Sequence, residues 1–258
     1  MPASLDLANE KNHLFEASTT QVLIDLLPVA RFLVSNGSEI VVERGPEASE
    51  PSLRWRILGP GFGALLLQRN ACVLHATVVE TPHGAVGLMG RSGAGKSTLA
   101  AALVARGHRL LLDDVCAVTL NEGMTWAETG NPYPKLWADA IDALGLDRGE
   151  RLSTKLEKFE LKAGAPPTRA FRLQAMIALE PGEAWSLTPL SMEERMTLCL
   201  AHTYRREYLP GMGRSASNFS RCAEIAARLQ AYRLTRPRTF AAMDETVSLI
   251  ERTLEEAA

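Results

Sequence analysis

The sequence predicts an α/β fold built on a twisted sheet, with a β-rich N-terminal part and a helical C-terminal part. Between residues 31 and 79, short apolar runs are separated by turn-forming residues, which is typical of strands. Residues 85–114 have the pattern of a strand, a glycine-rich turn, a helix and a second strand. After residue 190, the spacing of the apolar residues is mainly that of helices.

Length and composition indicate a globular protein. The chain has 258 residues, 46% of them hydrophobic, and can bury a substantial core. We expect a short N-terminal segment, residues 1–30, followed by a single domain over residues 31–258. The formal net charge is -2 and no basic block occurs, which argues against a nucleic-acid-binding protein. The four cysteines lie far apart, without the close pairs of zinc or redox sites.

The N-terminus lacks the features of a targeting segment. It has neither the basic start nor the apolar stretch of a signal peptide, and no apolar run in the chain reaches the length of a membrane span. We therefore expect a cytoplasmic protein that acts without a membrane.

The elements before the glycine-rich turn are predicted as follows. Apolar spacing over Thr20–Leu27 predicts a short amphipathic helix, which Pro28 would end. Strands are then predicted at five apolar runs: FLV, EIVVE, LRWRIL, ALLLQ and CVLHATVV. Turn-forming segments such as NGS, GPGFG and RNA separate these runs.

The next elements form a compact unit. Ala85–Met89 is predicted as a buried strand, Ser97–Arg106 as a helix closed by Gly107, and Arg109–Asp113 as a second strand. The proline-rich and aromatic segment NPYPKLW is expected to be a rigid loop. Further helices are predicted at Ala138–Leu144, Ser191–His202, Ser217–Ala231 and Phe240–Leu254.

The glycine-rich turn carries a phosphate-binding pattern. Residues 90–97 match G-x-x-x-x-G-K-[ST], the P-loop, in which backbone N–H groups and a helix N-terminus surround phosphate oxygens. Lys96 would hold the β- and γ-phosphates of ATP, and the hydroxyl of Ser97 would ligate Mg²⁺. The predicted ATP-binding residues are Gly90, Arg91, Ser92, Gly93, Ala94, Gly95, Lys96, Ser97 and Thr98.

Two carboxylates follow at the end of the second strand. Asp113 and Asp114 lie where ligands bind in open α/β sheets, and adjacent carboxylates point in different directions. One would accept a hydroxyl proton during phosphoryl transfer while the other orients Mg²⁺ directly or through water. His75, inside an apolar strand, is by itself a packing residue unless a partner lies nearby.

At this point the stretch LHATVVETPHGAVGLMGRSGAGKSTLAAALVARGHRLLLDDV resembles the core of the HPr kinase/phosphorylase family. The histidine ahead of the P-loop, the RGHRL helix end and the Asp-Asp strand end all occur at the family's spacing. The resemblance implies an ATP-dependent serine kinase, with a sheet like that of the family's C-terminal, phosphoenolpyruvate-carboxykinase-like domain. The family often forms oligomers, so a homo-oligomer is an expectation.

The same resemblance assigns roles to individual residues. Asp113 matches the general base that takes the substrate serine proton, His75 its partner, and Asp114 the second acidic residue near the metal. Ser92 falls where a hydroxyl faces the phosphates. The segment GMGRS resembles the family's late arginine loop, which makes Arg214 a candidate for stabilising the transferred phosphoryl group.

The chain also departs from the family. Ala76 stands where the family has glycine, and NPYPKLWADA replaces the acidic segment after the Asp pair. Asp139 and Glu128 are alternative sources of an additional metal carboxylate, and the spacing does not decide between them. No counterpart of the segment associated with phosphorolysis is present, so the reverse reaction is not carried over.

The substrate is left with alternatives. The PYPKLW segment and the LHA variant are more similar to HPr-kinase-like tailoring kinases of ribosomal peptide clusters, including lasso peptide kinases that phosphorylate a precursor serine. We therefore expect a peptide or protein with an acceptor serine as partner. A small-molecule kinase on the same fold and a non-catalytic ATP-binding regulator are the alternatives.

Overall fold

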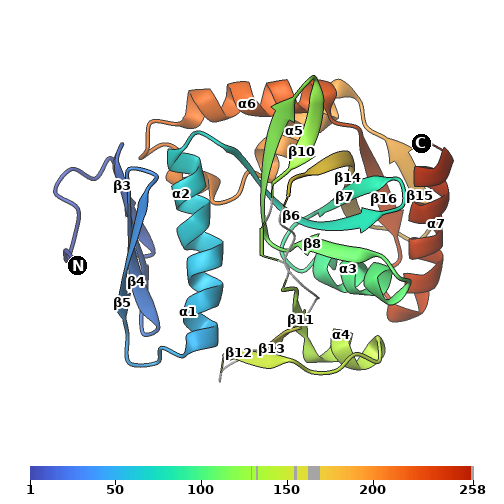
Figure 1. Ribbon diagram of the computed structural model, residues 1–258, viewed down its shortest axis with the longest axis horizontal. Coiled ribbons are helices and arrows are strands. Elements are labelled where there is room, and N and C mark those ends of the chain that lie inside the picture. Colours follow the sequence, from blue (N-terminus) through green and yellow to red (C-terminus); the bar gives the residue numbers. More distant parts are fainter. Residues whose placement is uncertain (129, 132, 154–155, 162–168, 257–258) are drawn as a thin grey trace. The chain divides into compact units, whose positions relative to one another are not determined.

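The computed structural model describes residues 1–128, 130–131, 133–153, 156–161 and 169–256, and it is a mixed α/β structure (Figure 1). Its contacts divide the chain into two compact units. The first unit comprises Met1–Val73 and Thr203–Cys222, and the second comprises Leu74–His202 and Ala223–Ala258. Each unit is described by itself.

The first unit contains a five-stranded antiparallel meander in which each strand pairs with the next. Its strands are β1 (Glu10–Lys11), β2 (Phe15–Ala17), β3 (Gln21–Leu26), β4 (Ala30–Ser35) and β5 (Glu39–Arg44). Its helical segments are α1 (Glu50–Arg56), the π-helix η1 (Ile57–Gly61), α2 (Phe62–Gln68), the 3-10 helix η2 (Arg206–Tyr208) and the first part of α6 (Ser215–Arg228).

The helix predicted over Thr20–Leu27 is wrong, because these residues form β3. Its eight residues are too few for apolar spacing to separate helix from strand. Val22 and Ile24 are β-branched and fully buried, and β3 pairs with strands on both sides. Strand pairing therefore decided the conformation.

The strands predicted at LRWRIL and ALLLQ are also wrong, since these runs lie in α1, η1 and α2. The helix begins with a reciprocal cap in which Ser49 and Ser52 bond each other's backbone N–H. Pro51 occupies the first turn, where its missing N–H has no cost. The strands predicted at FLV and EIVVE are confirmed as β4 and β5.

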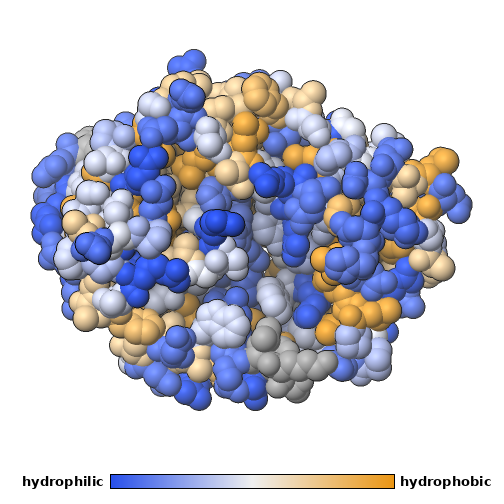
Figure 2. Space-filling view, turned by 180° about the vertical axis from the view of Figure 1, so that it is seen from behind, coloured by the Kyte–Doolittle hydropathy of each residue, from blue (hydrophilic) through white to orange (hydrophobic). Residues whose placement is uncertain are grey.

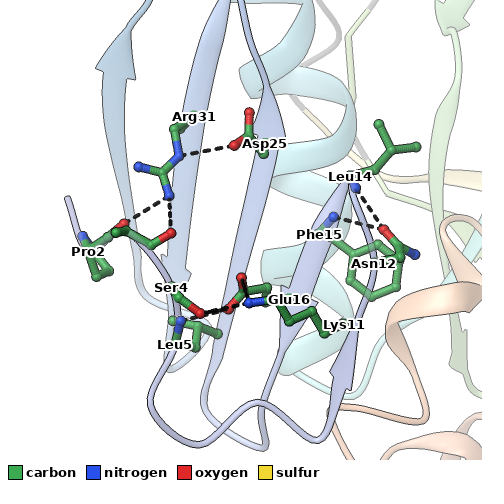
Figure 3. A network of polar contacts seen from close by, with 11 residues as sticks. Pro2, Ser4, Leu5, Lys11, Asn12, Leu14, Phe15, Glu16, Asp25 and Arg31 are labelled. Atoms are coloured by element: carbon green, nitrogen blue, oxygen red, sulfur yellow. Dashed lines mark hydrogen bonds and ion pairs between the residues drawn. The ribbon is translucent and has the colours of Figure 1, made fainter.

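Residues 1–30 belong to the same compact unit as the strands that follow (Figure 3). β3 pairs with β4 across the expected boundary. The guanidinium of Arg31 donates to the carbonyls of Pro2 and Ala3, at 2.9 Å each, and forms an ion pair with Asp25 at 3.4 Å. These contacts join the N-terminal residues to the sheet.

The second unit contains an eight-stranded sheet in the order β10-β9-β6-β7-β14-β16-β15, with β8 paired to β6. The strands are β6 (Cys72–Thr81), β7 (Gly84–Met89), β8 (Arg109–Leu112), β9 (Val115–Asn121), β10 (Met124–Ala127), β14 (Phe171–Pro181), β15 (Ser186–Pro189) and β16 (Ala231–Arg236). A smaller sheet has the order β11 (Lys135–Trp137), β13 (Leu156–Glu160), β12 (Glu150–Ser153). The helices are α3 (Lys96–Ala105), α4 (Ala138–Ala143), α5 (Met192–Ala201), η3 (Phe240–Ala242), α7 (Met243–Glu256) and the end of α6.

The strand, helix and strand predicted around the glycine-rich turn are confirmed as β7, α3 and β8. β6 lies between the two strands and is antiparallel to both, so β7 and β8 run in the same direction. Their carboxyl ends therefore meet at one edge of the sheet, where the turn follows β7 and Asp113 follows β8.

The core of this unit lies between the sheet and helices α3 and α7. Leu99 and Leu103 of α3 and Ile250 of α7 are almost fully buried against Leu88 and Ile177 of the sheet. Burying this apolar layer stabilises the position of the turn at the start of α3, because a close-packed core resists displacement.

The predicted helices in the C-terminal part are confirmed as α5, α6 and α7, and the one after NPYPKLW as α4. Ala231 was placed in a helix but begins β16. Strands β14, β15 and β16 were not predicted. β14 and β15 precede the helical part, β16 interrupts it, and β14 is the parallel neighbour of β7.

Among the described residues, no helix is both long and apolar enough to cross a membrane. On the face shown in Figure 2, hydrophilic residues cover most of the surface and hydrophobic residues form separate patches between them.

Candidate active site

The glycine-rich loop, residues 90–95, joins the end of β7 to the start of α3. Gly93 and Gly95 have φ of 80° and 92°, a region that favours glycine. A Cβ on Gly95 would also lie 2.8 Å from the Nη2 atom of Arg236. Arg91, Ser92 and Gly93 are exposed at the tip of the loop.

No side chain caps the N-terminus of α3. The N–H groups of the first helical turn have no partner within the helix and carry its positive dipole end. The loop and this turn therefore present backbone donors of the kind that bind phosphate oxygens.

Lys96 is folded back against the loop. Its Nζ donates to the carbonyl of Gly90 at 2.8 Å, and the residue is 7% exposed. Burial lowers the pKa of Lys96, although Asp113 and Asp114 act in the opposite direction. A buried ammonium held by a carbonyl would gain from a phosphate at the same place, because the phosphate supplies a full counter-charge.

Asp113 lies at the centre of the polar contacts and is 4% exposed. Its Oδ1 accepts hydrogen bonds from Thr77 at 2.6 Å and from the hydroxyl of Ser97 at 3.2 Å. Its Oδ2 accepts the backbone N–H of Lys135 at 3.2 Å. The structure thus brings together Ser97, in the first turn of α3, and Asp113, which directly follows β8.

Asp114 faces a different set of partners. Its two oxygens lie 2.9 Å from Nδ1 of His75 and 3.1 Å from Nζ of Lys135. Burial acts to raise the pKa of Asp114, but the hydrogen bond to His75 and the charge of Lys135 outweigh it and hold the pKa well below its usual range. Asp114 has φ of 83°, an uncommon backbone conformation outside glycine.

These contacts bear on the predicted metal role of Asp114. Both carboxylates have partners on both of their oxygens: Asp113 accepts from Thr77, Ser97 and the N–H of Lys135, and Asp114 lies against His75 and Lys135. Asp113 is the carboxylate that contacts the hydroxyl of Ser97. The metal role of Asp114 stays a prediction.

Sequence reasoning missed three residues of this site: Thr77, Lys135 and Lys158. Lys135 was inside a segment interpreted as a rigid loop, but it begins β11 and its side chain is 5% exposed. The available signal was its place between Pro134 and Leu136, in an apolar segment. Because lysine is seldom buried without a partner, this place could have indicated an acidic partner for Lys135.

Lys158 adds a third ammonium group. Burial, followed by the charge of Lys135, lowers the pKa of Lys158, while Asp113 and Asp114 act to raise it. Its Nζ lies 5.5 Å from the ring centroid of Trp137. Three lysines and two aspartates therefore interact electrostatically here, which favours an anionic ligand.

Three further candidates have other contacts. Arg214 belongs to the first unit, where its guanidinium donates to the carbonyl of Gln68 at 3.3 Å, and its role at the phosphoryl group stays a prediction. Glu128 accepts a hydrogen bond from Thr119 at 2.8 Å. The carboxylate of Asp139 accepts the N–H of Ala140 at 2.8 Å.

Within the described ranges, no three His, Cys, Asp or Glu side chains form a group that could hold a metal. Mg²⁺ commonly takes only one or two protein ligands and completes its shell with substrate phosphates and water. The hydroxyl of Ser97 would be one such ligand.

Comparisons with known proteins add little to this geometry. No protein-family model matches the chain. No curated protein matches it either. Among solved structures, the HPr(Ser) kinase/phosphatase from Coxiella burnetii is similar with a TM-score of 0.40 and 14% sequence identity. The match covers 71% of this chain and 97% of that chain. At this level of likeness, the chemistry has to be argued from the residues of the site.

Proposed function

We propose that the protein is an ATP-dependent serine kinase that transfers the γ-phosphate to a hydroxyl of a peptide or protein. The observation that carries the proposal is the contact between Ser97 and Asp113 beside Lys96 and the glycine-rich loop. A phosphate-binding turn, a lysine, a metal-binding hydroxyl and a carboxylate at one edge of a sheet are the parts that phosphoryl transfer requires.

Each residue has a defined part in the transfer. The N–H groups of the glycine-rich loop and Lys96 would hold the phosphates, and the hydroxyl of Ser97 would ligate Mg²⁺, which neutralises charge on the phosphate oxygens. The acceptor oxygen forms a bond to the γ-phosphorus as the bond to the bridging oxygen breaks, and ADP leaves with that electron pair. The hydroxyl proton passes to the carboxylate of Asp113.

The second carboxylate and its partners would serve as positioning residues. They are Asp114, His75 and Lys135. His75 and Lys135 keep Asp114 charged, and Asp114 in turn fixes their orientation. Asp113, which contacts the hydroxyl of Ser97, is the proposed base. Lys135 also donates its backbone N–H to Asp113, so β11 links the two carboxylates.

The choice of a peptide acceptor rests on sequence resemblance. The PYPKLW segment, which supplies Lys135, and the LHA sequence around His75 are similar to those of kinases that modify ribosomally made precursor peptides. We therefore propose a precursor peptide, such as that of a lasso peptide, as the substrate, with its acceptor serine in a flexible chain end.

The test is phosphate transfer followed by mass spectrometry. The full chain is incubated with Mg-ATP and serine peptides, including those encoded beside its gene, and each peptide is examined for phosphoserine. We expect transfer by the wild type and a loss of about 100-fold or more in Asp113→Asn, because a general base contributes about that much. Asp244→Asn, a carboxylate that is 96% exposed, is the matched control and should retain activity.

Other outcomes would separate the alternatives. ATP binding without transfer to any peptide would contradict the peptide kinase, and transfer to a small hydroxyl compound under those conditions would make it a small-molecule kinase. Transfer at the wild-type rate by Asp113→Asn would overturn the assigned base.

A further inference from the structure

A cavity of 680 Å³ lies against the glycine-rich loop within the second unit. Its lining includes Gly93, Gly95 and Thr98 on the loop and the first turn of α3. The other walls come from the start of α4 and from residues 236–243, which connect β16 to α7. This volume lies in the usual range of small-ligand sites. Lys96, Ser97 and Asp113 are not among the residues that line it.

The wall next to the loop is positively charged. Arg236 donates to the carbonyls of Ala94 and Pro237, at 3.5 and 3.2 Å, and Arg238 donates to the carbonyl of Gly93. Within the described part of the chain, neither arginine forms an ion pair with a carboxylate, and Nε of Arg236 has no hydrogen-bond partner. Arg236 is only 4% exposed. A buried cation without a counter-charge is costly, so an anionic group beside the loop would stabilise this wall.

The remaining walls are aromatic and acidic. Trp137 and Phe240 come from different elements, line the same cavity, and are 48% and 43% exposed. Asp139 and Glu157 also line the cavity. Carboxylates repel further phosphates but accept hydrogen bonds from hydroxyl and amino groups. This part therefore suits a neutral ring system that carries such donors.

The phosphate-binding residues and the cavity lie at different places along the glycine-rich loop. In a P-loop the lysine reaches the β- and γ-phosphates, which places the far end of the triphosphate at Lys96, Ser97 and Asp113. The cavity instead adjoins Gly95 and Thr98, where the α-phosphate and the nucleoside attached to it would extend away from the loop.

We propose that this cavity is the nucleoside subsite, in which Trp137 and Phe240 contact the base and Arg236 and Arg238 neutralise the first phosphate. The inference rests on the proposed nucleotide-dependent function and deepens it. Aromatic contact with a base tolerates different bases, because every base has a π-face. The subsite thus makes the nucleoside, and not the phosphates alone, a source of affinity.

The experiment compares two ligands on the full chain by titration calorimetry: Mg-ATP and inorganic tripolyphosphate with Mg²⁺. We expect Trp137→Ala and Phe240→Ala each to weaken ATP binding about 10-fold, the typical effect of removing one aromatic contact, and to leave tripolyphosphate binding unchanged. The matched controls are Trp185→Ala and Phe219→Ala, which remove side chains that are 42% and 56% exposed and lie outside the cavity lining. They should leave both affinities unchanged.

The failures are distinguishable. If the wild type binds both ligands and the two cavity variants bind ATP as well as the wild type does, the subsite is wrong and the proposed kinase stands. If the variants lose affinity for ATP and for tripolyphosphate equally, the substitutions have disturbed the phosphate-binding loop. The proposed contact with the base is then overturned. If the wild type binds neither ligand, the subsite and the proposed function fail together.

Discussion

At the scale of single residues, Lys135 connects the parts of the candidate site. Its side chain pairs with Asp114, its backbone N–H bonds to Asp113, and its charge lowers the pKa of Lys158. It reaches this position through a three-stranded sheet that is remote in sequence from the glycine-rich loop. A pair of this kind costs desolvation, so removing one partner leaves the other charge poorly compensated.

The pair between Lys135 and Asp114 can be measured by a double-mutant cycle. We expect Lys135→Met and Asp114→Asn each to lower the free energy of unfolding by about 2–4 kcal/mol, because each removes one charge of a largely desolvated pair whose side chains are 5% and 20% exposed. Asparagine tolerates the positive φ of residue 114. The double variant should be less destabilised than the sum, with a coupling of about 1–3 kcal/mol in urea unfolding.

An exposed pair supplies the control for this cycle. Nη2 of Arg252 lies 3.2 Å from Oε1 of Glu245, and the two side chains are 57% and 56% exposed. Their coupling should not exceed about 1 kcal/mol, because solvent screens surface pairs. Strict additivity at Lys135 and Asp114 would show that the buried contact contributes no pairwise energy.

At the scale of elements, the N-terminal strands are held to one another by a buried carboxylate. Glu16 of β2 accepts hydrogen bonds from the hydroxyl of Ser4 and the N–H of Leu5, at 2.7 Å each, and pairs with Lys11 at 2.6 Å (Figure 3). The hydrogen bond from Lys11 is the largest cause that lowers the pKa of Glu16 from 4.5 to about 2, against the opposing effect of burial.

This pKa sets a pH dependence of stability. Since the folded-state pKa lies below the unfolded value, the stabilisation by Glu16 is fully present above about pH 4.5 and is lost as pH falls toward about 2. Glu16→Gln should therefore lower the free energy of unfolding by about 1–3 kcal/mol at pH 7, and the difference from the wild type should shrink between pH 4.5 and pH 2.

Urea unfolding at a series of pH values measures this difference. Glu39→Gln, at the exposed start of β5, is the matched control and should change stability by no more than about 0.5 kcal/mol. A difference for Glu16→Gln that stays constant from pH 7 to pH 2 would rule out the carboxylate as its source.

At the scale of the whole molecule, each unit is assembled from two separate stretches of the chain. In the first unit, the ring of Phe15 lies 4.7 Å from that of Tyr208, and Tyr204 packs so closely over Gly63 that a Cβ there would overlap its ring. The core of this unit therefore needs residues 203–222 as well as the N-terminal strands.

A fragment of residues 31–258, the domain that the sequence predicts, tests this assembly. It lacks β1 to β3 and leaves one edge of β4 unpaired, with Phe32 and Val34 no longer buried. We expect hydrogen exchange to show residues 31–73 unprotected, while amides of α3 and β7 in the other core remain protected. Native protection over residues 31–73 in this fragment would show that the N-terminal strands are dispensable.

The sequence alone was sufficient for the parts of the fold that local chemistry controls. The P-loop pattern of residues 90–97 and the flanking strand, helix and strand are short-range features, and β7, α3 and β8 follow them closely. It also identified Lys96, Ser97 and Asp113 as candidates, because the spacing of residue types within one β-α-β stretch can be read directly.

Tertiary structure decided the rest, because the deciding contacts join residues that are far apart in the chain. Pairing with β2 and β4 made residues 21–26 a strand where their spacing suggested a helix. The pairing of β11 with β13 brought Lys135 to Asp114, a contact that the sequence did not predict. Sequence determines which residue types are available near a phosphate-binding turn, whereas only long-range packing determines which of them share one site, since burial and charge act through space.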